Sequence, residues 1–317
     1  MPAEAYCSRS STADLVPEFD DPLTTCPLCD SPEINIYDRD FAGRFVDHCC
    51  RCQLLFMNPQ YTADYLDKYY ASYGQCGAGK LEIPDPEDLS ERRVAAKADA
   101  LHLLETHAEP GRFLSIGCND GIELLLAERR GWKPEGYDVD EATMTLLRQQ
   151  VTFPIYSGNF FELRLPDDHY DCVFMDQVLE HPKNPQDYLR EVHRVLRPGG
   201  LLYIGCPNIR SLSSRLKTTL GKLGLKQRRG KHYDMFHHLF FYDPRTLART
   251  LEAYYGFSTV VAQGDPLIGL KTMKLEGNWR TRCSNWLRRE WPLLESSFRL
   301  LVRKTANKAA VVTRRAA

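Results

Sequence analysis

The stretch Phe113-Leu-Ser-Ile-Gly-Cys-Asn-Asp-Gly121 decides the fold of this chain. Its apolar residues predict a buried strand, its glycines predict a tight turn, and residues 122–130 predict a helix. In an open α/β sheet, such a junction presents backbone N–H groups and a helix N-terminus to a nucleotide-like ligand. A glycine turn alone is weak evidence, because glycine ends many strands for steric reasons.

The segments that follow supply the missing context. Residues 133–138 predict a second strand that ends in Asp138, 21 positions after Gly117. This spacing is close to the roughly 20 positions at which a carboxylate reaches ribose hydroxyl groups. Further strands are predicted over 154–157, 170–176, 201–205 and 256–261, with helices over 185–196 and 245–255.

Four motifs in this order resemble the class I S-adenosylmethionine (SAM) dependent methyltransferases. They are Leu114–Gly121, Gly136-Tyr-Asp138, Val178-Leu-Glu-His181 and Glu191–Gly200, within residues 90–262. The resemblance implies an α/β fold with a Rossmann-like, seven-stranded sheet and SAM as the cofactor. A dehydrogenase is the competing interpretation, but it requires Gly-x-Gly-x-x-Gly, which this turn lacks.

The resemblance places SAM at the carboxyl ends of the first strands. The implied cofactor residues are Gly117, Cys118, Asn119, Gly121, Asp138, Asn159, Asp176 and Gln177. Ser115 stands where most of the family has Asp, which removes a carboxylate that often binds the ammonium group of the ligand. Asn119 stands where most have Gly, and an Asn also tolerates the left-handed conformation.

Two Cys-x-x-Cys pairs near the N-terminus predict a structural zinc site. The pairs are Cys26 with Cys29 and Cys49 with Cys52, separated by residues 30–48. Four thiolates complete a tetrahedral site and leave no open position for catalysis. His48 and Cys50 remain substitute ligands, and redox or incidental cysteines are the alternative interpretation.

This module, with the Ile-Gly-x-Asn-Asp-Gly turn, resembles the zinc-containing nucleotide-sugar C-methyltransferases. Residues 21–75 carry more acidic than basic side chains, so no nucleic acid partner is expected. In the resembling enzymes, a His-Glu-His-Leu run supplies the base. His238-Leu239 matches its last two residues, His237 stands at the Glu position, and Phe236 replaces the first His. The resemblance thus implies His238 as the base and His237 as its support; loop-capping histidines are the alternative.

His181 is a third candidate catalytic residue. Its expected place is in the lining of the pocket or at the start of a helix. In ubiquinone-type O-methyltransferases, a Glu-x-x-Glu-His run at this place can hold a divalent cation. Here Gln177 occupies the first Glu position and leaves only Glu180 and His181, which make a poor metal site.

The distribution of charge and apolar residues predicts the remaining organisation. We expect an arm (1–20), a zinc-ribbon module (21–75), a linker (76–89), a methyltransferase domain (90–277, with a substrate-side insertion at 207–242) and a basic helical tail (278–317). Residues 210–231 contain eight basic residues and no acid. In the tail, Leu287, Trp291, Leu294, Phe298 and Leu301 recur at helical spacing. Such a helix docks on its own domain, on a dimer mate or on an anionic membrane.

No apolar run reaches the roughly 18–20 residues of a membrane span, and no signal-peptide core is evident, so a cytoplasmic location is expected. The sequence predicts a SAM-dependent methyltransferase with a structural zinc. Its acceptor would be a hydroxyl or activated carbon of a sugar-containing or similarly polar metabolite. The alternatives are a membrane-associated quinone or lipid O-methyltransferase and a non-catalytic binding protein; an oligomer stays open.

Overall fold

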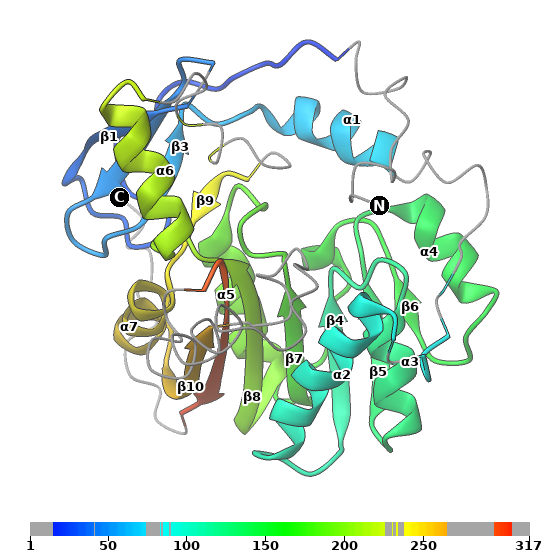
Figure 1. The fold of residues 1–317 in the computed structure, drawn as a ribbon. Helices are drawn as coiled ribbons and strands as arrows, with labels where there is room; N and C mark the ends of the chain where they lie inside the picture. The colour runs from blue at the N-terminus through cyan, green and yellow to red at the C-terminus, as the bar shows by residue number, and fades with distance from the viewer. Residues whose placement is uncertain are drawn as a thin grey trace. The chain divides into compact units, whose positions relative to one another are not determined.

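The structure is a computed structural model of the 317-residue chain. It describes residues 15–40, 42–73, 83, 85–88, 90–225, 230, 233, 238–264 and 295–305. These residues contain a seven-stranded sheet and a four-stranded sheet (Figure 1). The chain divides into two compact units.

The larger sheet has the order β10-β11-β8-β7-β4-β5-β6. Its strands are β4 (Arg112–Ile116), β5 (Lys133–Tyr137), β6 (Ile155–Tyr156), β7 (Tyr170–Asp176), β8 (Leu196–Pro207), β10 (Phe257–Gly264) and β11 (Ser297–Lys304). Strands β4, β5 and β6 pair in parallel, whereas β11 is antiparallel to both of its neighbours. The predicted α/β class with a mostly parallel, seven-stranded sheet is confirmed.

The first unit comprises residues 1–21, 60–174 and 195–197. Its helices are α1 (Ala63–Tyr73), α2 (Arg92–Glu105), α3 (Ile122–Arg129) and α4 (Glu141–Arg148). Strand β5 lies so close to α3 that a Cβ on Gly136 would be 2.5 Å from a Leu124 methyl carbon. The fully buried Phe113 of β4 packs against the rings of Trp132 and Phe174, both with centroids 5.7 Å away.

The second unit comprises residues 22–59, 175–194 and 198–317. Its small sheet has the order β1-β2-β3-β9, from β1 (Ile34–Arg39), β2 (Phe45–Cys49), β3 (Leu55–Asn58) and β9 (Phe240–Phe241). Strand β9 comes from the substrate-side segment, and its residues pair with Leu55 and Phe56 of β3. The cysteine module and the candidate catalytic segment therefore share one sheet. The helices of this unit are α5 (Pro185–Val195), α6 (Leu212–Lys222) and α7 (Pro244–Tyr254).

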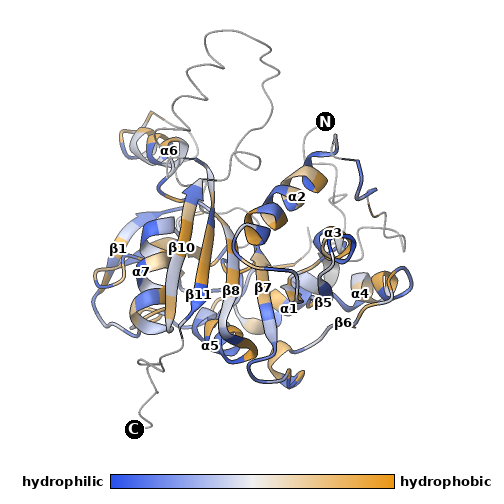
Figure 2. Cartoon of the chain, turned by 90° about the horizontal axis from the view of Figure 1, so that it is seen from below, coloured by the Kyte–Doolittle hydropathy of each residue, from blue (hydrophilic) through white to orange (hydrophobic). Residues whose placement is uncertain are grey.

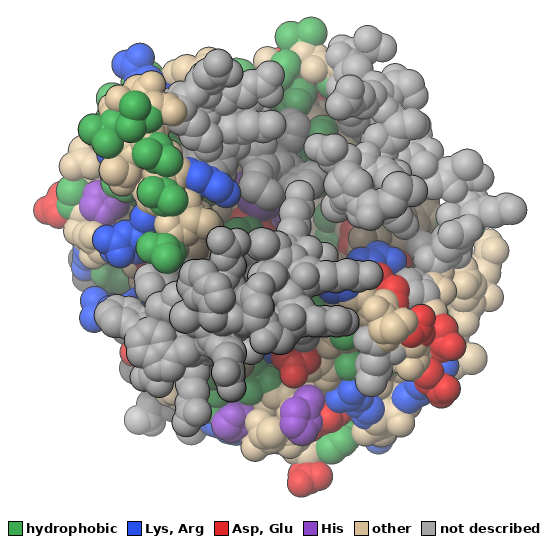
Figure 3. Space-filling model, in the orientation of Figure 1, with side chains coloured by type: hydrophobic (Ala, Val, Ile, Leu, Met, Phe, Trp, Pro, Cys, Tyr) green, Lys and Arg blue, Asp and Glu red, His purple; other side chains and the backbone are tan. Residues whose placement is uncertain are grey.

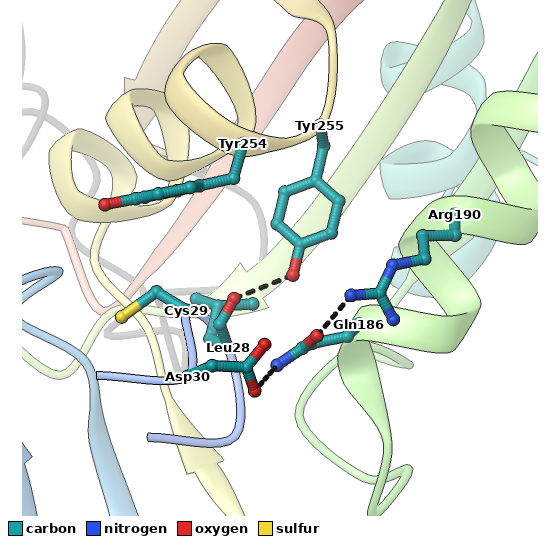
Figure 4. Close-up of a pocket in the computed structure, with 7 residues that line it drawn as sticks. All are labelled: Leu28, Cys29, Asp30, Gln186, Arg190, Tyr254 and Tyr255. Atoms are coloured by element: carbon teal, nitrogen blue, oxygen red, sulfur yellow. Dashed lines mark hydrogen bonds between the residues drawn. The ribbon is translucent and has the colours of Figure 1, made fainter. Parts of the chain in front are cut away.

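The first cysteine knuckle is held to the helices of the same unit by polar contacts (Figure 4). The Tyr255 hydroxyl donates a hydrogen bond of 2.7 Å to the Leu28 carbonyl. Gln186 of α5 donates to Asp30 at 2.7 Å and accepts from Arg190 at 2.5 Å. These side chains line a small hollow. The polar groups of the hollow hydrogen-bond to one another, so its role is structural: it connects the first cysteine knuckle to α5 and to Tyr255.

The prediction of a helical tail is wrong over residues 297–304, which form β11. Phe298, Leu300 and Val302 alternate with side chains that are also buried, so both faces of the strand are covered, and its two edges pair with β8 and β10. Apolar residues accordingly run along β11 and β8 (Figure 2). Residues 278–294 and 306–317 of the predicted tail lie outside the described part.

Among the helices that the structure describes, none combines the length and hydropathy needed to cross a bilayer.

Candidate active site

The glycine turn after β4 has the backbone conformation that its sequence predicts. Gly117, Asn119 and Gly121 have φ angles of 75°, 44° and 74°, so Asn119 adopts the left-handed conformation expected of it. Gly121 begins α3 without a side-chain cap. Asp120 Oδ1 accepts the N–H of Ile122 at 3.4 Å, so a polar ligand at the start of α3 would meet this carboxylate as well as backbone N–H groups.

Asp138 lies directly beside this turn, at the carboxyl end of β5. Its carboxylate accepts the N–H of Asn119 at 3.0 Å and the N–H of Asp140 at 3.1 Å. Burial raises the pKa of this carboxyl group above its ordinary value. Cys118 lies in the same corner with its thiol buried, and burial raises its pKa as well. The structure thus brings Gly117, Cys118, Asn119, Gly121 and Asp138 together.

Ser115 stands where most of the family has Asp, and a buried carboxylate that the sequence motifs did not reveal, Glu123, lies beside it. The Ser115 hydroxyl donates to Glu123 Oε1 at 2.7 Å, and Lys97 Nζ lies 3.4 Å from Glu123 Oε2. Desolvation raises the pKa of Glu123, and the Lys97 charge and the Ser115 hydrogen bond oppose this effect. A carboxylate therefore remains within hydrogen-bonding reach of the substituted position, supplied by α3.

Asn159 stands at the start of a short 3-10 turn, Phe160–Glu162. Its side-chain oxygen accepts the N–H of Phe161 at 3.1 Å, and its amide nitrogen donates to Glu162 at 2.9 Å. These bonds fix the orientation of the amide. Its adenine role stays a prediction.

Asp176 and Gln177 belong to the second unit, at the end of β7. Gln177 has a φ angle of 59°, and its N–H donates to the carbonyl of Gly205 at 2.8 Å. A Cβ on Gly205 would be only 2.0 Å from Asp176 Oδ1, so a larger residue at this point of β8 would displace the Asp176 carboxylate. The side-chain nitrogen of Gln177 is buried and has no hydrogen-bond partner among the described residues. A ligand that accepts a hydrogen bond would satisfy it.

Glu180, His181 and His238 form the chemically most distinctive cluster of the second unit. The His181 and His238 rings pack edge to face with centroids 4.7 Å apart. His238 Nε2 lies 4.0 Å from Glu180 Oε1, and Glu180 is 1% exposed. Burial raises the pKa of Glu180 to about 8, while the Cys206 thiol donates to its other oxygen at 3.3 Å. His237 and Phe236 lie outside the described residues.

Backbone hydrogen bonds hold His238 beside Glu180. The N–H groups of Leu239 and Phe240 both donate to the Glu180 carbonyl, at 2.9 and 3.2 Å. On the other side, the Leu239 carbonyl accepts the N–H of Met57 in β3 at 2.9 Å. The position of His238 therefore depends on the cysteine module as well as on the segment after β7.

The four predicted metal-ligating cysteines converge in the second unit. The sulfurs of Cys26 and Cys52 are 3.5 Å apart, and those of Cys29 and Cys49 are 3.7 Å apart. A tetrahedral zinc ion with Zn–S bonds of about 2.3 Å requires sulfurs about 3.8 Å apart, so the spacing fits. Hydrogen bonds from Cys26 and Cys52 lower the pKa of Cys29, whereas the bonding to Cys29 raises the pKa of Cys26.

Two groups of side chains among the described residues could hold a metal ion. One is the cysteine cluster, and the other is Glu180 with His181 and His238, whose ligand atoms lie within 4.8 Å of one another. His238 would supply the third ligand that the run around His181 lacks in sequence. The nearby Cys50, although it adjoins Cys49, is exposed and accepts a hydrogen bond from Asn35.

Comparisons with known proteins agree with this geometry. A family model described as a methyltransferase domain matches residues 89–262. A probable SAM-dependent methyltransferase of Mycolicibacterium smegmatis is 38% identical over 96 residues, which are 30% of this chain and 37% of that protein. A ubiquinone biosynthesis O-methyltransferase of Aeromonas salmonicida is 29% identical over 109 residues, 31% of this chain and 43% of that protein. The chain thus spans less than half the length of these two relatives.

The fold is shared with solved methyltransferase structures. The 1,6-didemethyltoxoflavin-N1-methyltransferase of Burkholderia thailandensis, solved with bound 1,6-didemethyltoxoflavin and S-adenosylhomocysteine, has a TM-score of 0.50 and 17% sequence identity. The match covers 86% of this chain and 99% of that chain. These findings favour an enzyme over a non-catalytic binding protein. The chain therefore belongs to the class I SAM-dependent methyltransferases.

Proposed function

We propose that this enzyme methylates a hydroxyl group or an activated carbon of a sugar-containing or similarly polar small metabolite, with His238 as the general base. The observation that carries this proposal is the position of His238 beside the buried Glu180, with the His181 ring packed against it. The substrate class follows from the resemblance to the nucleotide-sugar C-methyltransferases and from the cysteine module that precedes the methyltransferase domain.

The chemistry needs a proton acceptor at the substrate. SAM supplies an electrophilic methyl group, and the acceptor oxygen or carbon must lose its proton as the new bond forms. An imidazole accepts such a proton near neutral pH without a metal. In this enzyme, a protonated His238 would lie beside Glu180 and favour its ionised form, since an opposite charge within a few ångströms favours ionisation.

The four cysteines are proposed to bind one structural zinc ion. Each knuckle would supply two thiolates, and the closed coordination shell would leave the metal no catalytic role. Its effect on function would be indirect. The zinc would stabilise β1, β2 and β3, and β3 in turn pairs with β9, which begins two residues after His238.

The test is methyl transfer to a panel of acceptors, measured as release of S-adenosylhomocysteine. The panel contains nucleotide sugars and hydroxylated quinones. With the best acceptor, His238→Ala should lower turnover by roughly 10²–10⁴-fold, the usual effect of losing a general base, while SAM affinity changes little. The matched control is His102→Ala, which alters an exposed histidine of α2. Equal turnover in wild type and His238→Ala would remove His238 from the role of base.

A quinone or lipid acceptor is the second candidate, because one relative is named for ubiquinone biosynthesis. Preferential methylation of the hydroxylated quinones would replace the sugar proposal. The general-base role of His238 would then be judged separately, from the His238→Ala variant with the quinone as acceptor.

A divalent cation held by Glu180, His181 and His238 is a second candidate mechanism, favoured by the convergence of their ligand atoms. The two mechanisms predict different metal contents. With His238 as a base that binds no metal, the protein holds one zinc per chain, and His181→Ala leaves the zinc content unchanged. With a cation at the cluster, purified protein loaded with Zn²⁺ or Mn²⁺ holds a second ion, and His181→Ala loses it.

A further inference from the structure

Helix α6 is amphipathic in the reverse of the usual sense. The side that faces the protein is small and polar: Gly221 is buried, and Ser214 and Thr218 are half-buried. The opposite side carries leucines, and Leu212 and Leu216 are 59% and 58% exposed. An ordinary surface helix buries its apolar stripe and exposes its polar one. Here the apolar stripe is directed outward.

The apolar surface continues beyond the helix. Leu223 and Leu225, which follow α6, are 66% and 72% exposed. On β1, Ile36 is 62% exposed and Tyr37 is 41% exposed. Lys222 of α6 lies over the Tyr37 ring, with its Nζ 4.5 Å from the centroid, so helix and strand form one surface. We call these six apolar side chains, all in the second unit, the α6–β1 face.

Basic side chains border this face. On a helical wheel, Leu212, Leu216 and Leu223 fall within one narrow arc, with Arg215 and Lys222 on one flank and Lys217 on the other. All three basic residues are exposed, and residues 210–231 contain no acid. Figure 3 shows the hydrophobic side chains gathered over α6, with Lys and Arg side chains around them. An apolar stripe between two basic flanks is the pattern of a helix that lies in a membrane interface.

We propose that the α6–β1 face docks this enzyme on an anionic phospholipid surface. The leucines would enter the boundary between headgroups and acyl chains, and the flanking Arg and Lys side chains would contact the anionic headgroups. Charge selects this partner, because a basic border complements an anionic leaflet. A second copy of the chain would instead bring Arg215, Lys217 and Lys222 close to the same residues of its mate. The proposal goes beyond the proposed function and does not depend on which acceptor is methylated.

The same structure argues against the tail as the membrane contact over residues 297–304. That segment is β11 of the large sheet, where Phe298, Leu300 and Leu301 are fully buried. Exposed apolar area, which membrane binding needs, is present on α6 and not on β11.

The experiment is co-sedimentation of the full chain with sucrose-loaded vesicles of phosphatidylcholine, with and without phosphatidylglycerol. Binding should require phosphatidylglycerol and fall as salt is raised. The triple variant Leu212→Ser/Leu216→Ser/Leu223→Ser should lower the partition coefficient by about tenfold or more, because three apolar side chains no longer enter the interface. Val16→Ser, a change at a 78% exposed apolar residue elsewhere, should bind like wild type.

A second variant tests the charge separately from the leucines. Arg215→Gln/Lys217→Gln should weaken binding to the vesicles that contain phosphatidylglycerol and reduce its dependence on salt. All variants should keep the SAM affinity and melting temperature of wild type, since the changed side chains are exposed. The proposal fails if wild type does not sediment with anionic vesicles at low salt. It also fails if the triple variant binds like wild type, or if the leucines mediate only a dimer seen by light scattering.

Discussion

At the scale of single residues, Glu180 combines nearly complete burial with a direct link to the candidate chemistry. It is 1% exposed, it accepts two backbone N–H bonds through its carbonyl, and its side chain faces His238. A buried carboxylate resists ionisation because the interior solvates charge poorly. Its protonation state therefore affects both the stability of the fold and the basicity of the neighbouring imidazole.

The first prediction concerns the pH dependence of stability. Burial raises the pKa of Glu180 from 4.5 to about 8, so the folded protein keeps a proton that the unfolded chain has lost. The stabilising effect is fully present below the unfolded pKa and is lost as the pH rises through the folded pKa. Glu180→Gln removes this titration while keeping the shape. In SAM-free protein, the unfolding free energy of wild type should therefore fall more steeply than that of the variant, by at most about 1.4 kcal/mol per pH unit.

Denaturant unfolding at several pH values between the two pKa values provides the measurement. Glu109→Gln, at an exposed position before β4, serves as the control and should keep the slope of wild type. Parallel curves for wild type and Glu180→Gln would show that Glu180 ionises normally in the folded protein.

The second prediction concerns the cofactor. Asp138 lies at the carboxyl end of β5, beside the glycine turn, with its carboxylate fixed by the N–H groups of Asn119 and Asp140. Asp138→Ala should weaken SAM binding by about 1.5–3 kcal/mol, the usual size of a charge-assisted hydrogen bond. Calorimetric titration measures the affinity, and zinc content should stay unchanged. Asp64→Ala, which alters an exposed ion pair of α1, is the control. An affinity within about twofold of wild type would remove Asp138 from ribose binding.

At the scale of secondary-structure elements, glycines set how closely strands and helices approach. A Cβ on Gly136 would lie 2.5 Å from a Leu124 methyl carbon, 2.8 Å from an Ile155 methyl carbon and 3.0 Å from the Cys118 sulfur. The space between β5, α3 and β6 is therefore filled. The close approach also keeps Cys118 and the glycine turn in position beside Asp138.

The third prediction follows from this packing. Gly136→Ala should lower the unfolding free energy by about 1–3 kcal/mol, the usual cost of overpacking, and should weaken SAM binding as the turn shifts. Gly158→Ala is the comparison: its φ of +87° makes alanine strained, but a Cβ there has nothing within 4 Å. Thermal melting should rank Gly136→Ala as the less stable variant. The reverse order would mean that α3 moves away from β5 easily.

At the scale of the whole molecule, the cysteine module and the candidate base are structurally coupled. The four cysteines lie around the hairpin β1–β2, β3 pairs with β9, and β9 begins two residues after His238. In contrast, the glycine turn and Asp138 belong to the other compact unit. Loss of the proposed zinc should therefore affect catalysis more than cofactor binding.

The fourth prediction tests this coupling. Cys26→Ser should lose the zinc, expose the module to proteolysis and lower turnover, while SAM affinity stays close to that of wild type. Cys50→Ser, an adjacent cysteine outside the cluster, should retain one zinc per chain and full turnover. Metal analysis, limited proteolysis and calorimetry provide the readouts. Full zinc content in Cys26→Ser would show that the ligand set is wrong; normal turnover without zinc would show that β9 holds its place unaided.

The sequence alone determined the features that depend on neighbours along the chain. The apolar run before Gly117 predicted β4, and the spacing of the cysteines predicted their cluster. The position of Asp138 at the end of the next strand predicted a carboxylate near the glycine turn. Each depends on a local rule: apolar burial in a strand, positive φ at a glycine or asparagine turn, and two thiolates per knuckle. These rules need no knowledge of distant contacts.

Only the tertiary structure decided the pairings between residues far apart in sequence. The contacts of His238 with Glu180, of β9 with β3 and of Ser115 with Glu123 all result from long-range packing. The segment 297–304 has apolar residues at helical spacing, yet it becomes a strand because the edges of β8 and β10 offer it backbone hydrogen bonds. Likewise, the leucines of α6 fit an ordinary buried stripe in sequence, and only the packing of its small polar side shows that they are directed outward. A one-dimensional pattern fixes which side chains share a face, but the direction of that face depends on what the rest of the fold places against it.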